Sequence, residues 1–596
     1  MKKACYLSVG LILTCALLYL LAYLATPSSE STVSTISAQQ LPPVPYPADF
    51  ETKLRQTKSL KISLKTIDDI PQDISWICGC DFPEIGSPLA VKGGTLRVSN
   101  VGPFPANFLA FGSPAPQFFH YNLFDRVNVP LVRKHPATGQ TIPGLAEAWA
   151  EHDGMLWFRL NPAARYSNGR PVRAGDFALS ASMREKVGDM ALSHIAAELI
   201  LYSDSVLAIK PHKKTLFPHL AVAAALHPAE PGFYAEFGSD YQTRYQNRIP
   251  PTTGAYTVGK LQRGRLIALV RNDSWWAKDV PGFRFTCNAD VIEHHFLTDE
   301  AQVWELFLRG KLDLLQTRNI VAWQEYLGHA DSRIIQQRFE VALPMPPYGI
   351  ALNAQALPNV DLRRGLMYAM DMQRAMNVIF RGDAERLPRF SYGFRHLNYQ
   401  IPQYQYHPEQ ARKHFAAAGF THQGSDGILQ QADGTRLSIR LAFTPSEKVN
   451  TLVSLLIQSA AACGAEIVAE PLPWQHCADA VNKGQHQMLF WATMPSADSP
   501  NYRRFFHSSA RGEDAPFCLN DAQLDSLIEQ TEQADTLAAA AEACEKVDSY
   551  IHDLAIWLPG WMENRVNIAT WPHVHLPQGS YATYDIIESH TFWLSN

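Results

Sequence analysis

The residue types that most often carry out chemistry in proteins occur in this sequence without the spacing that catalysis requires. There is no G-x-S-x-G nucleophile elbow, no phosphate-binding G-x-x-x-x-G-K loop and no H-E-x-x-H zinc helix. His294 and His295 are adjacent in an alternating, strand-like stretch, which sends their rings to opposite faces and away from a shared metal ion. No spacing of carboxylates singles out a general acid and base. We therefore expect no catalytic residue, metal or cofactor, and a hydrolase remains an alternative.

One stretch combines residues that suit ligand binding, "FWATMPSADSPNYRRFF" from Phe490 to Phe506. Trp491 ends a predicted strand, where it could either line a cleft or pack in the core. Asp498 could hold a ligand or cap nearby amides in a turn. Arg503 and Arg504 could each make two parallel hydrogen bonds to a ligand carboxylate or phosphate, or be solvated. The sequence leaves both interpretations open for each residue.

Seven of the nine cysteines follow the N-terminal apolar segment. Seven is an odd number, so at least one is unpaired within the chain, and the others are either buried thiols or form one or two disulfides. Cys78 and Cys80 lack the two-residue spacer of a redox or zinc pair, so we expect no metal there.

The length and net charge of the chain limit the class of protein to which it can belong. A chain of 596 residues is longer than one hydrophobic core usually supports, so two or more lobes are expected. Its 52 basic and 57 acidic residues give a formal charge of -5, and no basic block stands out. Nucleic acid is therefore not an expected partner.

Residues 1–27 read as a signal peptide or an N-terminal membrane anchor. Lys2 and Lys3 precede about 22 mostly apolar residues, which as a helix would cross the hydrocarbon layer. The lysines favour export of the rest of the chain, so we expect a periplasmic protein that this segment, if uncleaved, anchors to the inner membrane. Residues 28–75 are interpreted as a linker and N-terminal extension, with the folded body beginning near Trp76.

Beyond Trp76, short strands and helices are mixed, which predicts an α+β (mixed α/β) fold. A helix is expected from about residue 300, with Thr298 and Asp299 as capping candidates. In "PEQARKHFAAAGF", Pro408 opens a helix and Gly419 closes it. A helical pattern in the run from 524 to 557 is expected to end at Pro559.

A series of motifs resembles the family 5 extracellular solute-binding proteins, which are the binding components of ABC importers. The series includes "KGGTLRVSN", "LFDRVNVPLVRKHPATGQTIPGLAEAWA", "MLWFRLNPAARYSNGRPVRAGDFALSASM", "PTTGAYTV", "FLRGKLDLL" and "ALNAQALPNVDLRRGLMYAMDMQRAM". Each motif is weak alone, but their order and spacing match from about residue 90 to the end. "RNDSWWAKDVPGFRF" is most similar to the branch of peptide and microcin C-type receptors.

The resemblance implies a periplasmic-binding-protein-like fold, in which two clamping lobes and an additional lobe leave a ligand cleft between lobes. Lobe I would comprise residues 76–130, 240–317 and 563–596. Lobe II would be residues 131–239, and lobe III residues 318–562, with hinge crossings near 318 and 562. An extended peptide in such a cleft is held mainly through its main chain.

The implied function is capture of oligopeptides or peptide-like compounds for an inner-membrane ABC permease, by a protein that we expect to be a monomer. The alternatives are a receptor for another solute on the same fold, or an anchored sensory or envelope protein that no longer feeds a transporter. Where the family places an amino-terminus-binding Asp, this chain has Ser496, so Asp498 would serve only if the turn is re-registered. The residues expected at the ligand are Trp491, Asp498, Arg503, Tyr348, Trp323 and Asp125.

Overall fold

The computed structural model describes most of the chain. The described residues are 45–46, 50–54, 57–112, 127–212, 218–317, 319–327, 331–340, 346–381, 384, 386–394, 397–492, 500–510, 515–534, 536–563, 565–577 and 591–595.

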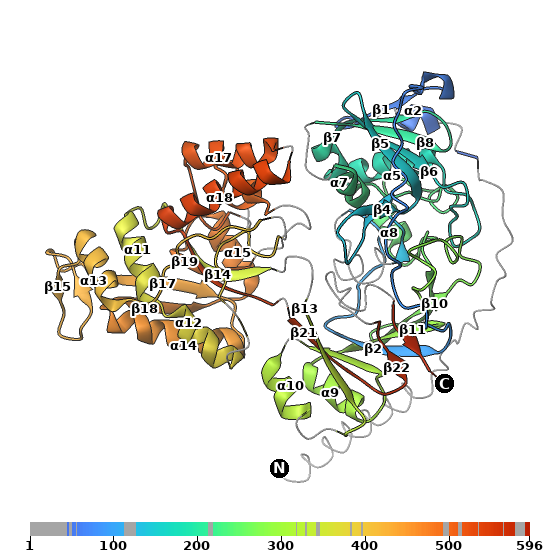
Figure 1. Cartoon of the computed structure of the whole chain (residues 1–596). Helices are drawn as coiled ribbons and strands as arrows, with labels where there is room; N and C mark the ends of the chain where they lie inside the picture. The colour runs from blue at the N-terminus through green and yellow to red at the C-terminus, as the bar shows by residue number, and fades with distance from the viewer. Residues whose placement is uncertain are drawn as a thin grey trace, which may run out of the picture.

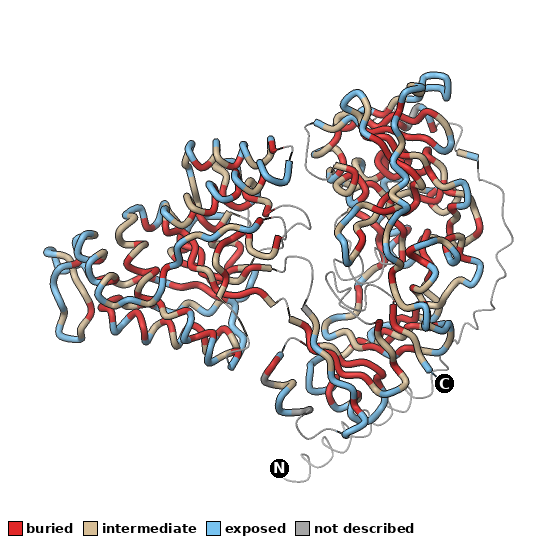
Figure 2. Tube along the Cα trace, viewed as in Figure 1, coloured by how far each residue is buried: buried red, intermediate tan, exposed pale blue. Residues whose placement is uncertain are grey.

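The chain has a mixed α/β fold, as predicted, and its elements form two bodies with a small sheet between them (Figure 1). We call residues 346–563 the C-terminal body. The N-terminal body contains the described residues from 45 to 297 and the last described segment. Figure 2 shows that buried residues follow the strands inside each body.

One half of the N-terminal body is a five-stranded sheet of order β1-β7-β8-β6-β5. Its strands are β1 (Lys61–Leu64), β7 (Ala196–Leu201), β8 (Val206–Pro211), β6 (Met155–Leu160) and β5 (Ala146–His152). The associated helices are α2 (Phe50–Leu54), α5 (Ala174–Lys186), α6 (Ala191–Ile195), α7 (Pro218–Ala225) and α8 (Tyr241–Tyr245). A short hairpin of β3 (Val132–Lys134) and β4 (Thr141–Pro143) and the 3-10 turn η1 (Ile67–Asp69) complete this half.

The folded body begins earlier than the predicted start near Trp76. Strand β1 pairs in parallel with β7 at the edge of the five-stranded sheet, and α2 packs against α5. Upstream of both, the Tyr46 hydroxyl donates a hydrogen bond to Asp176 Oδ1 at 2.8 Å. These elements were missed because β1 has only four residues and its partner lies more than 130 positions away.

The other half of the N-terminal body is a four-stranded sheet of order β2-β11-β10-β9. Its strands are β2 (Thr95–Val101), β11 (Val291–Leu297), β10 (Leu266–Arg271) and β9 (Tyr256–Gln262). The expected strand at His294 and His295 is confirmed as β11, where His294 is buried and His295 half-buried. Near the C-terminus, β22 (Val574–His575) pairs with β23 (Trp593–Leu594).

A three-stranded sheet, which we call the bridging sheet, connects the two bodies (Figure 1). Strand β21 (Arg565–Thr570) lies between β12 (Leu314–Thr317) and β13 (Ile335–Glu340), antiparallel to both. Helices α9 (Glu300–Leu308) and α10 (Ile320–Leu327) accompany it. The chain passes to the C-terminal body from β13 to β14 and returns from β20 to β21. The lobe boundaries expected from the sequence remain a prediction.

The C-terminal body is built on a five-stranded sheet of order β18-β17-β19-β14-β20. The strands are β14 (Pro347–Leu352), β17 (Ser438–Phe443), β18 (Glu466–Pro471), β19 (Met488–Ala492) and β20 (Trp557–Met562), with a hairpin of β15 (His422–Gln423) and β16 (Leu429–Gln430). Its helices are α11 (Val360–Ala369), α12 (Met372–Phe380), α13 (Pro408–Ala417), α14 (Glu447–Ala462), α15 (Trp474–Asn482), α16 (Tyr502–Phe506), α17 (Ala522–Gln533) and α18 (Leu537–Leu554).

Two helix boundaries confirm the sequence analysis and one corrects it. Asp299 caps α9 by accepting a hydrogen bond from the Gln302 amide, and α13 begins at Pro408 and is followed by Gly419 with φ +96. Pro559, however, does not end α18. That helix ends at Leu554, its C-cap Ala555 has a left-handed backbone (φ 50), and Pro559 lies inside β20. The left-handed backbone of Ala555 therefore ends the helix before the chain reaches Pro559.

All seven cysteines after the N-terminal segment lie among the described residues, and all are free thiols. The buried-thiol interpretation therefore applies to Cys463, Cys477 and Cys544, whereas Cys78 and Cys80 are exposed. Burial raises the pKa of the Cys544 thiol to about 12, which makes it a poor nucleophile.

Candidate ligand-binding site

The predicted site residues Tyr348 and Trp491 lie on neighbouring antiparallel strands, β14 and β19, of the C-terminal body. Tyr348 pairs with Ala492, and Gly349 pairs with Trp491. Because directly paired residues share a face and successive residues alternate, the Tyr348 and Trp491 side chains lie on opposite faces of the sheet. The strands bring the two positions together, but the two aromatic rings do not share one surface.

Trp491 is packed into the core in this structure. Its side chain is 3% exposed and makes edge contacts with Phe505 and Phe517, whose ring centroids lie 5.3 and 5.7 Å away. Core packing was one of the two interpretations that the sequence left open for this residue. A contact between Trp491 and a ligand stays a prediction.

Tyr348 is half-buried on the other face of the sheet. Its ring stacks on Trp561 of β20 at 5.2 Å and 10°, and on Phe490 of β19 at 6.0 Å and 19°. Trp561 in turn meets Phe380 of α12 edge to face. This stack fixes the tyrosine ring between two strands and holds it rigidly, which suits an aromatic contact for a ligand.

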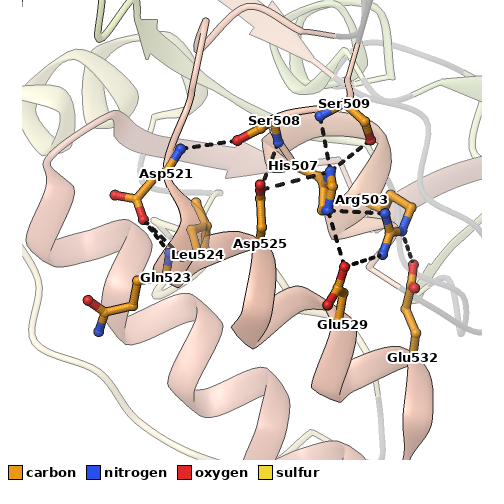
Figure 3. Close-up of polar contacts among 10 residues, drawn as sticks. All are labelled: Arg503, His507, Ser508, Ser509, Asp521, Gln523, Leu524, Asp525, Glu529 and Glu532. Carbon is orange, nitrogen blue, oxygen red and sulfur yellow. Dashed lines mark hydrogen bonds and ion pairs between the residues drawn. The ribbon is translucent and has the colours of Figure 1, made fainter.

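Arg503 belongs to α16, a short helix of the C-terminal body. Its Nε donates to Glu532 Oε1 at 2.7 Å, and its Nη2 lies 3.7 Å from Glu529 Oε1, both on α17 (Figure 3). The hydrogen bond with Glu532 holds the pKa of the Arg503 guanidinium above its usual range. With 40% of its side chain exposed, Arg503 is neither fully solvated nor fully enclosed.

A second set of contacts joins α16 to the start of α17 (Figure 3). His507 Nε2 lies 3.1 Å from Arg503 Nη1, and His507 Nδ1 accepts a hydrogen bond from the Ser509 hydroxyl at 2.7 Å. Asp525 Oδ1 accepts from the Ser508 amide at 2.8 Å. The position of α16 is therefore set by α17, on the side of the body that carries the acidic residues Glu529 and Glu532.

A buried aspartate holds the other side of α16. Asp548 of α18 accepts hydrogen bonds from Tyr502 at 2.9 Å, Tyr399 at 2.7 Å and Ser391 at 2.5 Å, and Arg389 Nε lies 3.9 Å away. Burial raises the pKa of the Asp548 carboxyl, and these hydrogen bonds and the arginine oppose that shift. Sequence analysis missed this cluster because Asp548 lies 157 positions from Ser391 and farther still from Arg389, and the residues match no motif.

The remaining predicted site residues are placed as follows. Trp323 lies on α10 beside the bridging sheet, half-buried, with its ring 6.4 Å from that of Trp304 on α9. It is therefore not on the sheet that carries Tyr348 and Trp491. Asp125 and Asp498 lie outside the described residues. Arg504 is exposed, and its guanidinium lies 5.5 Å from the centre of the Phe505 ring.

Two searches of the described part of the chain bear on other kinds of site. Within it, no group of three or more His, Cys, Asp or Glu side chains is arranged to hold a metal ion. No helix there combines the length and apolar character needed to cross a bilayer, and residues 1–44 were outside the search.

Solved structures of bacterial binding proteins have the same fold. The oligopeptide-binding protein AppA of Bacillus subtilis, solved with a nonapeptide, superposes with a TM-score of 0.67 over 85% of this chain and 100% of its own, at 15% identity. NikA of Brucella suis, solved with Fe(III)-EDTA, gives a TM-score of 0.71 over 84% of this chain and 100% of its own, at 18% identity. The architecture is thus that of a periplasmic solute-binding protein.

Residues 140–514 match the profile of the bacterial extracellular solute-binding proteins, family 5 (Middle), and the chain belongs to this family. The family consists of extracellular or periplasmic binding proteins of ABC transport systems, not of enzymes. This membership confirms the resemblance drawn from the sequence motifs.

The relatives found by comparing sequences are only distantly related to this chain, at 24% to 25% identity. A binding protein of Brucella melitensis is 25% identical over 326 residues, 51% of this chain and 52% of that protein. The peptidoglycan-binding protein YepA of Agrobacterium fabrum is 24% identical over 255 residues, covering 40% and 41%. OppA, the periplasmic oligopeptide-binding protein of Salmonella typhimurium, is 24% identical over 339 residues, covering 50% and 58%. This chain spans about half the length of the first of these relatives.

Proposed function

We propose that this protein captures oligopeptides or peptide-like compounds and delivers them to an ABC permease in the inner membrane. The observation that carries the proposal is that oligopeptide-binding proteins recur among its relatives in both sequence and fold, as OppA and AppA. YepA, a peptidoglycan-binding protein, extends the set toward peptide-like ligands. The stretch with the doubled Trp275 and Trp276 is similar to the branch of peptide and microcin C-type receptors, and this similarity also supports the proposal.

Two bodies joined by a small sheet suit this function. A ligand that touches both bodies only when they approach each other shifts an open–closed equilibrium toward the closed state. Candidates for contact are Trp491, Tyr348 and Arg503 on the C-terminal body and Trp323 beside the bridging sheet. Asp498 and Asp125 stay candidates from the sequence alone. Residues 1–27 would anchor the protein to the inner membrane, or be removed as a signal peptide, and the body would act as a monomer.

A second candidate function is a receptor for a different solute on the same fold. It is favoured by NikA, whose structure was solved with Fe(III)-EDTA and superposes as well as that of AppA. An anchored sensory or envelope protein that no longer feeds a transporter is the third. It would account for the serine at position 496, where peptide-binding relatives carry an aspartate.

A thermal-shift screen separates the first two candidates. A ligand that binds only the native state raises the melting temperature, and the rise grows with the logarithm of its free concentration once that exceeds the Kd. We expect di- to hexapeptides to raise it in a concentration-dependent manner, with amidated and N-acylated forms testing whether the peptide termini are read. Stabilisation by metal–EDTA chelates or opines, with none by any peptide, would contradict the peptide assignment.

Import is tested separately, in cells. Deletion of the gene should abolish growth on a peptide that stabilises the purified protein, when that peptide is the only source of a required amino acid. Growth that is unaffected, together with peptide binding in vitro, would favour the sensory candidate over the transport receptor.

A further inference from the structure

Two thiols of the N-terminal body, Cys78 and Cys80, lie in contact at the protein surface. Both residues are exposed, and both are free thiols. The Cys80 thiol donates a hydrogen bond to the carbonyl oxygen of Cys78 at 3.2 Å, so the Cys80 side chain turns back over the residue that carries the other thiol. Their one-residue spacing did not predict a reactive pair, but the fold brings the two thiols together.

The Cys80 thiol is affected by its neighbour. Partial burial raises the pKa of the Cys80 thiol, and the charge of Cys78 and a hydrogen bond between the two side chains raise it further. Two thiols that influence each other in this way do not react independently.

The chain around the pair is held in place by strand β5. Ile77 and Trp149 exchange two backbone hydrogen bonds, at 2.8 and 3.0 Å. Gly79, between the two cysteines, has φ +54, and a Cβ at this position would lie 2.3 Å from Cη2 of Trp149. Glycine is therefore required here, both for its backbone conformation and for the close approach to the tryptophan.

The geometry of the pair permits a disulfide. Cα atoms two positions apart lie at most about 7 Å from each other, and the Cα atoms of a disulfide are usually about 4.4 to 6.8 Å apart. A bond across a single residue closes a very short loop, so it removes little entropy from the unfolded chain and adds little stability. An exposed disulfide is also more easily reduced than a buried structural one. A bond between Cys78 and Cys80 would therefore be reversible.

We propose that Cys78 and Cys80 form a redox-active dithiol site, whose substrates are low-molecular-weight disulfides. The Cys78 thiolate attacks one sulfur of the small disulfide, forms a mixed disulfide and releases a first small thiol, which takes up the proton that Cys78 lost. The Cys80 thiolate then attacks the Cys78 sulfur, closes the protein disulfide and releases a second small thiol, which takes up the proton from Cys80. Two electrons pass from the protein to the small disulfide, and the reverse reaction restores the dithiol. This exchange is separate from ligand capture, because both cysteines lie on one body.

Mass analysis of one tryptic peptide tests the proposal on the full-length wild-type protein. Residues 66–92 form a tryptic peptide that contains Cys78, Cys80 and no other cysteine. The native protein is treated with oxidised glutathione, alkylated with iodoacetamide and then digested. We expect this peptide to carry no alkyl group and to lack two hydrogen atoms, and we expect an excess of reduced glutathione to return it to the doubly alkylated form.

Three results of this experiment would overturn the proposal. The first is glutathione on one or both cysteines with no bond between them, and the second is no reaction at all. The third is a bond that an excess of reduced glutathione does not break, which would make it a structural disulfide.

Serine variants separate the roles of the two thiols. In Cys80→Ser, the mixed disulfide between Cys78 and glutathione should accumulate to at least about tenfold its wild-type level, because a neighbouring thiol reacts much faster than a second molecule does. Cys518→Ser, which changes a half-buried thiol of the C-terminal body, is the matched control and should leave the bond between Cys78 and Cys80 unchanged. Equal levels of the mixed disulfide in Cys80→Ser and wild type, or loss of the bond in Cys518→Ser, would contradict the assignment.

Discussion

The two bodies each contain a buried aspartate held by tyrosine hydroxyls, and the two clusters differ in their remaining partners. Asp176, on α5 of the N-terminal body, accepts from Tyr46 at 2.8 Å, from Tyr166 at 3.1 Å and from the Arg173 amide at 2.9 Å. Asp548, on α18 of the C-terminal body, combines three hydroxyl donors with the buried guanidinium of Arg389.

This difference sets how each cluster responds to change. Burial raises the pKa of both carboxyls, that of Asp176 to about 7, close to neutral pH. The Asp176 cluster should therefore be sensitive to pH. The Asp548 cluster should be sensitive to substitution, because losing its carboxylate leaves a buried arginine uncompensated. The second cluster supports α16 and Arg503, so the predicted ligand-binding edge depends on it.

The largest expected effect is that of Asp548→Asn on stability. Removing the negative charge beside the buried Arg389 should lower the free energy of unfolding by about 3 to 5 kcal/mol. Urea denaturation monitored by tryptophan fluorescence measures this. Asp553→Asn, at the exposed end of the same helix, is the matched control and should stay within about 0.5 kcal/mol of wild type. A loss below about 1 kcal/mol for Asp548→Asn would show that the pair with Arg389 is not important for stability.

The next effect is a pH dependence removed by Asp176→Asn. Between the unfolded pKa of 3.8 and the folded pKa of about 7, the native state binds more protons at Asp176 than the unfolded state does. The contribution of Asp176 is therefore fully present below pH 3.8, decreases as pH rises and is lost above about pH 7. Relative to the variant, wild type should lose on the order of 1 kcal/mol of unfolding free energy per pH unit across this window.

Denaturation curves of both proteins from pH 4.5 to 8 check this slope. The buried His219 and His486, whose pKa values are lowered by burial, titrate in the same range but are present in both proteins and cancel in the difference. Parallel stability curves for the two proteins would show that Asp176 does not titrate between these limits.

Single hydroxyl deletions compare the clusters directly. Tyr502→Phe removes a donor to Asp548 from a fully buried ring and should cost about 1.5 to 3 kcal/mol, the range for hydrogen bonds to charged groups. Tyr46→Phe should cost less, because Tyr46 is half-buried and water can replace its hydroxyl. Thermal and urea unfolding of the two variants would rank them, and an equal or reversed order would remove the distinction between the clusters.

The smallest stability effect is expected for Arg503→Gln. Its ion pairs with Glu529 and Glu532 are half-exposed, and such pairs contribute at most about 1 kcal/mol. If Arg503 contacts a peptide carboxylate, the same variant should raise the peptide Kd about tenfold or more, because a charge-assisted bond is lost. Glu532→Gln removes the ion pair but keeps the arginine, and it should leave the Kd nearly unchanged. An unchanged Kd in both variants would limit Arg503 to a structural role.

Local sequence signals predicted much of the fold. Asp299 and Pro408 fixed the starts of two helices through capping and proline geometry. Such signals act over a few residues and can be read directly. The prediction that Pro559 ends the helix was wrong because the helix had already ended before Ala555. No residue type in the sequence indicates the left-handed backbone at Ala555.

The candidate site was less predictable. Trp491 occupied the predicted strand, but which face it occupied depended on the register with β14, more than 140 positions away. The partners of Asp548 come together only when α16, α18 and segment 386–404 meet in the folded chain. Side chains from distant segments carry no periodicity or spacing that sequence analysis can detect.

The most direct test of peptide capture is the mass of whatever the purified protein carries. Native mass spectrometry of the protein expressed without residues 1–44, before and after denaturation, measures bound and released ligand together. We predict a released species that fragments into amino acids or peptide-like units and that restores the complex when added back. A released metal chelate, opine or sugar that rebinds in its place would contradict the account.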